Sequence, residues 1–490
     1  ACRDALQLWL QGLSALDGGK IEAGETTKEA VFQYFLGRVE TYDSKVQAFN
    51  YVNENGLNQE EWLLKGIPLA VKDIFCEKGV KTTASSKMLA DFVPPYNATV
   101  IEKLQKEGMS SLGKVSMDEF AMGSTGETSQ TVQSVNPWGT NRIPGGSSSG
   151  SAVSVAAGLA PAALWTDTGW SIRQPASLCN VVGFKPSYGR NSRFGVMPMA
   201  SSLDCPGTFT KTVKDAALLY NIMNGEDKLE NTSLKTKDII DMSIFENADL
   251  SGKKIGIPKE YFEEWLDKGV KETIEKSIEK MKELGAEIKE VSLPMTKYAI
   301  AAYYIICPAE VSTNLGRLDG IRYGHNSSDP YASMDELYLN NRTEGLGVEA
   351  KRRSIVWSYV LSAGFYDAYY KKATQIRTLI IEDFKKVFEE VDILLTPASP
   401  SVAWKKGEKS EDPVKMYLAD AYTIPASLAG LPGISVPAWF AHSEDEEKEL
   451  LPVGIQLLAP RLDETTLFEV SHAYEVATQF GKQNPIGFED

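Results

Sequence analysis

Apolar residues occur along the chain both in short runs and at helical spacing, and the two patterns predict strands and helices. Residues 67–71 and 254–257 are short segments, each of which we expect to be a buried strand. After the second segment, apolar residues recur every three or four positions and predict a helix that Gly285 ends; they are Val270, Ile274, Ile278, Met281 and Leu284. The two elements make a βα unit. Residues before about Asn53 are predicted to be helical.

The densest apolar stretch covers residues 152–164 and consists of Ala, Val and Leu with a single Gly, Pro and Ser. We expect it to be a buried helix that leads into a strand. It directly follows a Gly/Ser run at residues 145–151, a composition that is also typical of flexible linkers. Because linkers rarely lie inside the most apolar part of a chain, we place this run in the protein core.

Serines among glycines, with a lysine upstream, suggest the chemistry of an amide hydrolase. Glycine lets backbone N–H groups surround a developing oxyanion, and a serine supplies the nucleophile. Lys72 directly follows the predicted strand 67–71. An arbitrary lysine is usually a surface ion-pair partner, but this strand would carry Lys72 inward, where burial keeps an amine neutral and able to act as a base.

Composition excludes several other classes of function. The chain has only three histidines, and none lies near a serine flanked by glycines, which argues against a Ser-His-Asp triad and a zinc site. Its net charge of −15 is unsuited to gripping nucleic acid directly. Five cysteines without a CxxC pair, together with no membrane-length apolar run and no signal-peptide pattern, predict a cytoplasmic protein without a membrane association.

Five further motifs carry a resemblance to a known family. They are GIPLAVKD at residues 66–73, MDEFAMG at 117–123, NPW at 136–138, SIRQPAS at 171–177 and LAGLP at 428–432. With the serine segments they resemble the amidase signature family over roughly residues 30–468, and within it the glutamine-hydrolysing subunits of tRNA-dependent amidotransferases. The resemblance implies one α/β/α domain around a mixed β-sheet over residues 1–490. It would comprise an N-terminal helical region (1–53), a catalytic core (54–225) and a remainder that holds the substrate pocket (226–490).

The resemblance also implies the catalytic roles. Ser171 would be the nucleophile, Ser147 the bridging serine held by a cis peptide bond, and Lys72 the terminal base. Ser147 precedes Ser171 by 24 residues and follows Lys72 by 75, and both spacings fit the family pattern. The backbone of Thr168, Gly169 and Trp170 would form the oxyanion hole.

A pocket for a free amino acid needs opposite charges for its two charged groups. By resemblance, Arg353 would bind the α-carboxylate of glutamine, Asp420 would bind the ammonium, and Tyr303 would complete the pocket. From the residues alone, we would instead read the three side chains as a helix-surface arginine, a capping aspartate and a core tyrosine.

Trp170 departs from the family pattern, which has glycine directly before the nucleophile, and an indole there should obstruct the site. Several other tryptophans also stand where the pattern has glycine; they are Trp62, Trp165, Trp265, Trp357 and Trp439. Our hypothesis is that the source organism reads UGA as glycine, so that the native enzyme carries glycine at these positions. The alternative is a catalytically impaired scaffold with genuine tryptophans. Since glycine is favoured at positive φ, we expect strained turns at these positions.

The expected function is that of a glutaminase subunit that supplies ammonia for conversion of Glu-tRNA(Gln) to Gln-tRNA(Gln). A partner B subunit would receive the ammonia, bind most of the tRNA and use ATP and magnesium, and a small C subunit would clasp both. This chain itself would need no cofactor or metal. A stand-alone amidase acting on small carboxamides is the alternative enzyme.

Overall fold

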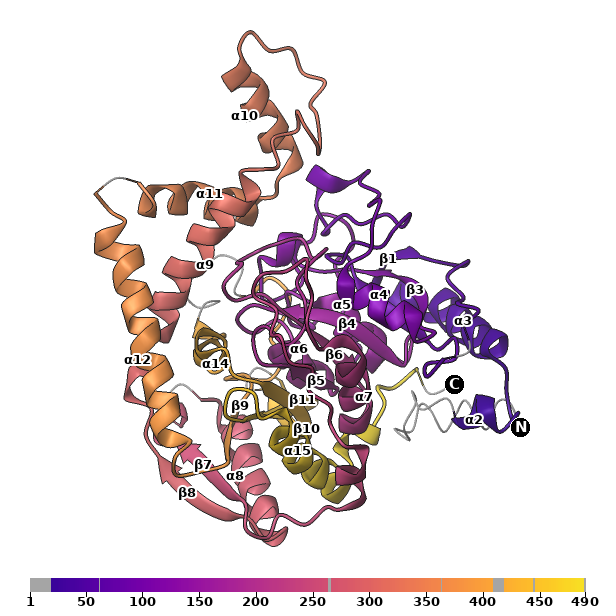
Figure 1. Ribbon diagram of the computed structural model, residues 1–490, viewed down its shortest axis with the longest axis vertical. Coiled ribbons are helices and arrows are strands. Elements are labelled where there is room, and N and C mark those ends of the chain that lie inside the picture. Colours follow the sequence, from indigo (N-terminus) through magenta and orange to yellow (C-terminus); the bar gives the residue numbers. More distant parts are fainter. Residues whose placement is uncertain are drawn as a thin grey trace.

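A single mixed sheet organises the chain. The computed structural model describes residues 19–60, 62–262, 266–362, 364–408, 418–443 and 446–488. Its eleven strands follow the order β1-β3-β2-β4-β6-β5-β10-β11-β9-β7-β8 (Figure 1). The strands are β1 (Phe49–Val52), β2 (Pro68–Lys72), β3 (Ser110–Val115), β4 (Ala162–Asp167), β5 (Val182–Lys185), β6 (Cys205–Thr210), β7 (Lys254–Pro258), β8 (Glu287–Val291), β9 (Ile393–Pro397), β10 (Gly433–Ser443) and β11 (Glu446–Leu458).

Strand directions are mixed, as the fold class predicted. Strand β2 pairs in parallel with β3 and β4, and β7 pairs in parallel with β8 and β9. The central strands β4, β6, β5, β10 and β11 pair antiparallel with one another in that order. Parallel neighbours leave the ends of β2 and β4 at the same edge of the sheet, and this edge carries the candidate site.

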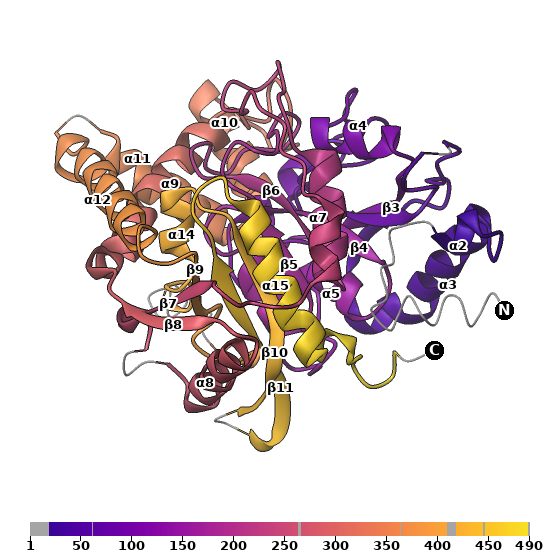
Figure 2. The same ribbon diagram turned by 60° about the horizontal axis from the view of Figure 1, so that its bottom comes forward.

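Helices cover both faces of the sheet (Figure 2). Along β4, Ala162 and Leu164 belong to one hydrophobic core and Ala163 and Trp165 to a second, because successive side chains of a strand point to opposite faces. The helices are α2 (Gly19–Glu22), α3 (Lys28–Val46), α4 (Thr99–Lys106), α5 (Ser149–Ala156), α6 (Arg173–Cys179), α7 (Val213–Met223), α8 (Lys268–Glu283), α9 (Ala299–Leu315), α10 (Met334–Gly345), α11 (Val348–Val360), α12 (Lys372–Val387), α14 (Ile424–Ala429) and α15 (Glu464–Thr478). The α/β/α layering is thereby confirmed.

Most elements predicted from the apolar pattern are present. Segment 67–71 corresponds to β2, 152–164 to α5 and β4, and 254–257 to β7. Helix α8 ends just before Gly285, which has φ +97°. The predicted N-terminal helical region is right for α3 but wrong at its end, where β1 pairs with β3 at the sheet edge. Residues 1–18 of that region lie outside the described part of the chain.

Helices α9, α11 and α12 form a group beside the sheet, and α10 projects away from it at the top of Figure 1. Helix α11 packs against α9 after the chain returns from α10. Among the described residues, no helix combines the length and apolarity that a membrane crossing requires.

Candidate active site

Lys72 is the last residue of β2 and is fully buried. Its amino group lies 3.0 Å from Ser147 Oγ, 2.6 Å from Ser148 Oγ and 3.1 Å from Thr166 Oγ1. Burial lowers the pKa of Lys72 to about 7, although the nearby carboxylates of Asp118, Asp204 and Asp167 act in the opposite direction. A lysine with this pKa is partly neutral near neutral pH and able to accept a proton.

The two candidate serines lie in direct contact. Ser147 Oγ is 2.9 Å from Ser171 Oγ, and the Ser147 backbone N–H donates to the same Ser171 oxygen at 3.1 Å. The Gly146–Ser147 peptide bond is cis, as the resemblance implied. Lys72, Ser147 and Ser171 therefore form a continuous chain of polar groups along which a proton can pass.

Asp118 packs against the cis peptide segment at Gly146 and Ser147. Its backbone N–H donates to the Ser147 carbonyl at 2.8 Å, and its carboxylate accepts the Gly126 N–H at 3.0 Å. A side chain on Gly146 would collide with this carboxylate. The glycine before Ser147 is therefore required by close packing.

The loop between β4 and α6 carries Ser171 and is fixed by a buried ion pair. Arg173 Nε lies 3.0 Å from Asp167 Oδ2, with both side chains inaccessible to solvent. Burial alone would raise the pKa of Asp167, but Arg173 holds it below its usual range. Arg173 also donates to the Gly169 carbonyl at 2.8 Å, so the ion pair fixes the conformation of the whole loop.

The same loop presents backbone donors beside the nucleophile. Within the described residues, the amide N–H groups of Gly169, Trp170 and Ser171 make no hydrogen bond to the protein. The Thr168 hydroxyl donates to Asp204 Oδ1 at 2.7 Å. Free N–H groups around a serine are the arrangement that stabilises a tetrahedral oxyanion.

Of the three residues predicted for the substrate pocket, Tyr303 on helix α9 contacts this loop, and Arg353 and Asp420 lie against the neighbouring Tyr304. Tyr303 packs against Gly169 so closely that a side chain at position 169 would collide with its phenol ring. Its neighbour Tyr304 donates to Asp420 Oδ2 at 3.1 Å and faces the Arg353 guanidinium, 6.0 Å from the ring centroid. Arg353 and Asp420 are both buried, so Arg353 is not on the helix surface, and it is ion-paired with Glu349 of its own helix.

Trp170 is buried on the pocket side of the loop. Its indole N–H donates to the Gly123 carbonyl at 3.1 Å, and its ring lies 5.2 Å from the Tyr303 ring and 6.1 Å from the Tyr304 ring, between centroids. The indole therefore fills space next to the residues that would bind the substrate.

The other tryptophans lie in different environments. Trp165 is buried and donates to the Ser171 carbonyl, whereas Trp62 and Trp439 are exposed. Trp357 lies within α11, and Trp265 is outside the described residues. The expectation of strained turns with positive φ is wrong for the tryptophans that the structure describes. The backbone at Trp62, Trp165, Trp170 and Trp439 does not have positive φ, and Trp357 is helical.

Sequence reasoning missed several residues that complete the site. Ser148 and Thr166 bind the lysine amino group, Asp118 supports the cis segment, and Tyr304 links Arg353 with Asp420. Ser148 and Thr166 lie next to motifs that the sequence analysis identifies, and this adjacency is the signal by which they could have been found. Tyr304 is adjacent to the predicted Tyr303, but its partner Asp420 is 116 residues away, so its role as a link had no sequence signal.

Comparisons with known proteins agree with this geometry. The Amidase family profile matches residues 30–468. The chain is 49% identical to the A subunit of glutamyl-tRNA(Gln) amidotransferase from Thioalkalivibrio sulfidiphilus, over 95% of this chain and 97% of that protein. It is 45% identical to the corresponding A subunit from Persephonella marina, over 98% of this chain and 100% of that protein.

Solved structures give the same result. The crystal structure of the glutamyl-tRNA(Gln) amidotransferase A subunit from Thermotoga maritima matches with a TM-score of 0.80 and 38% identity, over 94% of each chain. The peptide amidase of Stenotrophomonas maltophilia also matches with a TM-score of 0.80, at 26% identity over 96% of this chain and 97% of that one. The chain therefore belongs to the amidase family and, within it, to the group of glutamyl-tRNA(Gln) amidotransferase A subunits.

Proposed function

We propose that this protein is the glutamine-hydrolysing subunit of a glutamyl-tRNA(Gln) amidotransferase, with Ser171 as nucleophile. The observation that carries the proposal is the contact chain from Lys72 through Ser147 to Ser171, with 2.9 Å between the two serine oxygens and 3.0 Å between the Ser147 oxygen and the lysine nitrogen. A serine hydroxyl attacks an amide only when a base takes its proton, and this chain ends in a buried amine that can do so.

The reaction proceeds in two halves. Ser171 Oγ attacks the side-chain amide carbon of glutamine while its proton passes to Ser147 Oγ and the Ser147 proton passes to neutral Lys72. The N–H groups of the loop from Thr168 to Ser171 stabilise the oxyanion. The proton returns to the amide nitrogen, the C–N bond breaks, and ammonia leaves a glutamyl ester on Ser171. Water, activated along the same chain, then releases glutamate.

Substrate selection rests on the pocket side chains. Arg353 would bind the glutamine α-carboxylate and Asp420 its α-ammonium, with Tyr303 against the amide end. Both charged groups are buried, so hydrogen bonds between them and the opposite charges of the substrate would be strong.

The names of the relatives support a role within a larger enzyme. We expect a B subunit that receives ammonia, binds most of the tRNA and holds ATP and magnesium, and a C subunit that joins the two. A net charge of −15 is consistent with a chain that leaves the nucleic acid to its partner. We expect the complex in the cytoplasm.

One observation favours a second candidate. The indole of Trp170 occupies the space beside Tyr303 and Tyr304, which would leave less room for glutamine. A chain with a genuine tryptophan there would be a catalytically impaired scaffold in the same complex. The likeness to a peptide amidase keeps a stand-alone amidase as the further alternative.

Ammonia release from glutamine tests the proposal. It is measured, with the B and C subunits present, for the printed chain and for a form with glycine at Trp62, Trp165, Trp170, Trp265, Trp357 and Trp439. We expect activity in the glycine form, and Ser171→Ala in that form should abolish it. Activity in neither form would favour the scaffold or another amide substrate, and activity that needs no partner subunits would favour the stand-alone amidase.

A further inference from the structure

Glu119 joins two parts of the molecule that are distant in sequence. It lies in the MDEFAMG motif, at the start of a short 3-10 helix (Glu119–Ala121), and is buried. Its carboxylate accepts the Ser86 hydroxyl at 2.6 Å and the Gly347 backbone N–H at 3.0 and 2.9 Å, one distance for each oxygen. Both carboxylate oxygens are therefore engaged, and one partner is 228 residues away.

Gly347 directly precedes helix α11. The Gly347 carbonyl accepts the Lys351 N–H at 3.0 Å, which begins the hydrogen-bond ladder of the helix. The first N–H groups of a helix lack partners within it, and a carboxylate at this end is favoured by the helix dipole. A side chain at position 347 would collide with the Glu119 carboxylate, so glycine permits the close approach.

Helix α11 carries Arg353 about one and a half turns after this attachment. In its first turn Glu349 Oε1 accepts a hydrogen bond from Arg353 Nε at 2.8 Å, so the start of the helix and the arginine are tied together. A shift of the helix start would move Arg353 relative to Tyr304 on helix α9, which its guanidinium faces.

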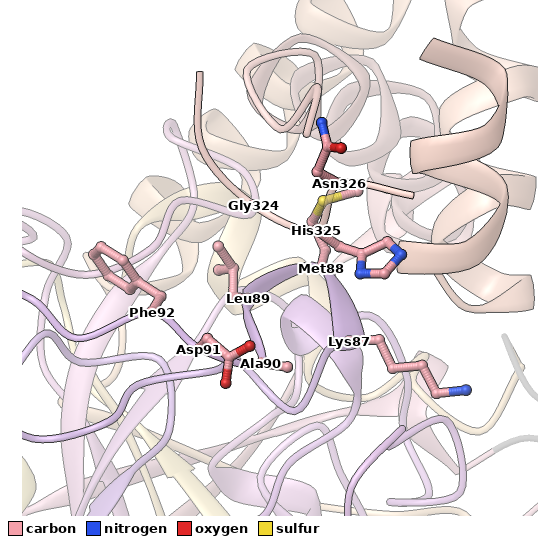
Figure 3. Close-up of a pocket in the computed structure, with 9 residues that line it drawn as sticks. All are labelled: Lys87, Met88, Leu89, Ala90, Asp91, Phe92, Gly324, His325 and Asn326. Carbon is pink, nitrogen blue, oxygen red and sulfur yellow. The ribbon is translucent and has the colours of Figure 1, made fainter. Parts of the chain in front are cut away.

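A neighbouring contact attaches a different segment. The His325 N–H donates to the Met88 carbonyl at 2.8 Å, and Figure 3 shows Met88 next to Gly324 and His325 at the rim of a pocket. This contact holds the chain before α10. The hydrogen bonds of Glu119, by contrast, attach the MDEFAMG motif to Gly347 at the start of α11.

We propose that Glu119 is a positioning residue for substrate: by fixing the start of α11, it holds Arg353 where the α-carboxylate of glutamine binds. The proposal rests on the proposed function, which makes Arg353 the carboxylate ligand. The preceding residue, Asp118, donates its backbone N–H to the Ser147 carbonyl at 2.8 Å. One dipeptide thus links the catalytic serine segment to the substrate helix.

The test is Glu119→Gln in the full chain with its partner subunits and glycine at the six tryptophan positions. The substitution keeps the shape but removes one acceptor and the charge. Burial raises the pKa of Glu119 to about 7, so the assay is run well above pH 7, where the carboxylate is charged. We expect the KM for glutamine to rise about tenfold, which is the loss of one charged hydrogen bond, while kcat stays within about twofold. The amide of γ-aminobutyric acid lacks the α-carboxylate, so its kcat/KM should not change.

The matched control is Glu344→Gln. Glu344 lies in α10 and binds His325 at 2.8 Å, and its described hydrogen bonds do not include Gly347. It should leave the KM for glutamine unchanged. An equal rise in KM for both variants, or an equal loss of kcat/KM on both substrates for Glu119→Gln, would indicate general loosening and overturn the proposal.

Hydrogen exchange separates this inference from the proposed function. In Glu119→Gln the amides of Gly347 and the first turn of α11 should exchange faster, whether or not glutamine is the substrate. Unchanged exchange there would overturn the positioning role. Faster exchange in a protein that neither binds nor hydrolyses glutamine would instead locate the failure in the proposed function.

Discussion

The amino group of Lys72 lies 3.0 Å from Ser147 Oγ and is hydrogen-bonded only to hydroxyl groups within the described structure. No carboxylate pairs directly with it there, so burial outweighs the attraction of more distant acids and lowers the pKa of Lys72 to about 7. This relationship is the basis for proposing that Lys72 acts as a base.

The first prediction concerns pH. Lys72 accepts a proton only when neutral, so kcat/KM for glutamine should rise with pH through about 7 and then level off. Protonation below that pH removes the base, so kcat/KM should fall about tenfold for each pH unit. Lys72→Met should lose activity by about 10²- to 10⁴-fold and lose the pH dependence of what remains. An acid limb that survives in Lys72→Met would assign the titration to another group.

The second prediction separates the serines. Ser171→Ala should abolish ammonia release, because the nucleophile is gone. Ser147→Ala keeps the nucleophile but breaks the path to Lys72, and should reduce kcat by about 10²- to 10⁴-fold. Ser149→Ala is the control, since the buried Ser149 hydroxyl has no hydrogen-bond partner among the described residues. Equal activity of the Ser147 and Ser149 variants would remove Ser147 from the mechanism.

The third prediction concerns stability. Asp167→Asn leaves the Arg173 charge buried without its partner and should lower the free energy of unfolding by about 3–5 kcal/mol, measured by denaturant titration. In the Lys253–Glu469 pair both side chains are partly exposed, so Glu469→Gln should cost about 1 kcal/mol or less. Similar costs for both variants would contradict the special role of the buried pair.

The sign of the pH effect on that pair follows from Asp167. Arg173 holds the pKa of Asp167 below its usual range even though burial favours the neutral acid. The pair therefore stabilises the fold above the unfolded-state pKa of about 4, and this contribution is lost as the pH falls below it.

Residues in local motifs could be identified from the sequence. Lys72 follows a short apolar strand, and Ser147 and Ser171 stand among glycines, so spacing and family resemblance were sufficient to find them. The structure then places all three in one hydrogen-bonded chain. Strands β2 and β4 were also predictable, because both are continuous buried runs.

Other parts depend on contacts that no local pattern records. Tyr304 reaches Asp420 across 116 residues, and Glu119 reaches Gly347 across 228. Strand β1 has four residues and pairs with only one neighbour, so its alternation is too short to distinguish from the end of a helix. These features follow from packing between distant segments.

The last prediction concerns the tryptophans at family glycine positions. If the source reads UGA as glycine, mass spectrometry of peptides from the native protein should show glycine at position 170. The backbone at Trp165 and Trp170 does not have positive φ, so either residue can adopt it and conformation does not decide the question. Peptides with tryptophan at 170 would end the recoding hypothesis.

Stability provides an independent test of the same hypothesis. Removing a genuine buried tryptophan leaves a cavity and costs about 3–5 kcal/mol. Trp138 is the control, because it belongs to the NPW motif that carries the family resemblance, donates to the Cys179 carbonyl at 3.0 Å and packs on Phe440. Trp138→Gly should therefore be strongly destabilising. In a core that evolved around glycine, however, the indoles of Trp165 and Trp170 are additions, and overpacking costs about 1–3 kcal/mol. Replacing both with glycine should raise the free energy of unfolding, and a loss as large as that of Trp138→Gly would mean that the core evolved around indoles.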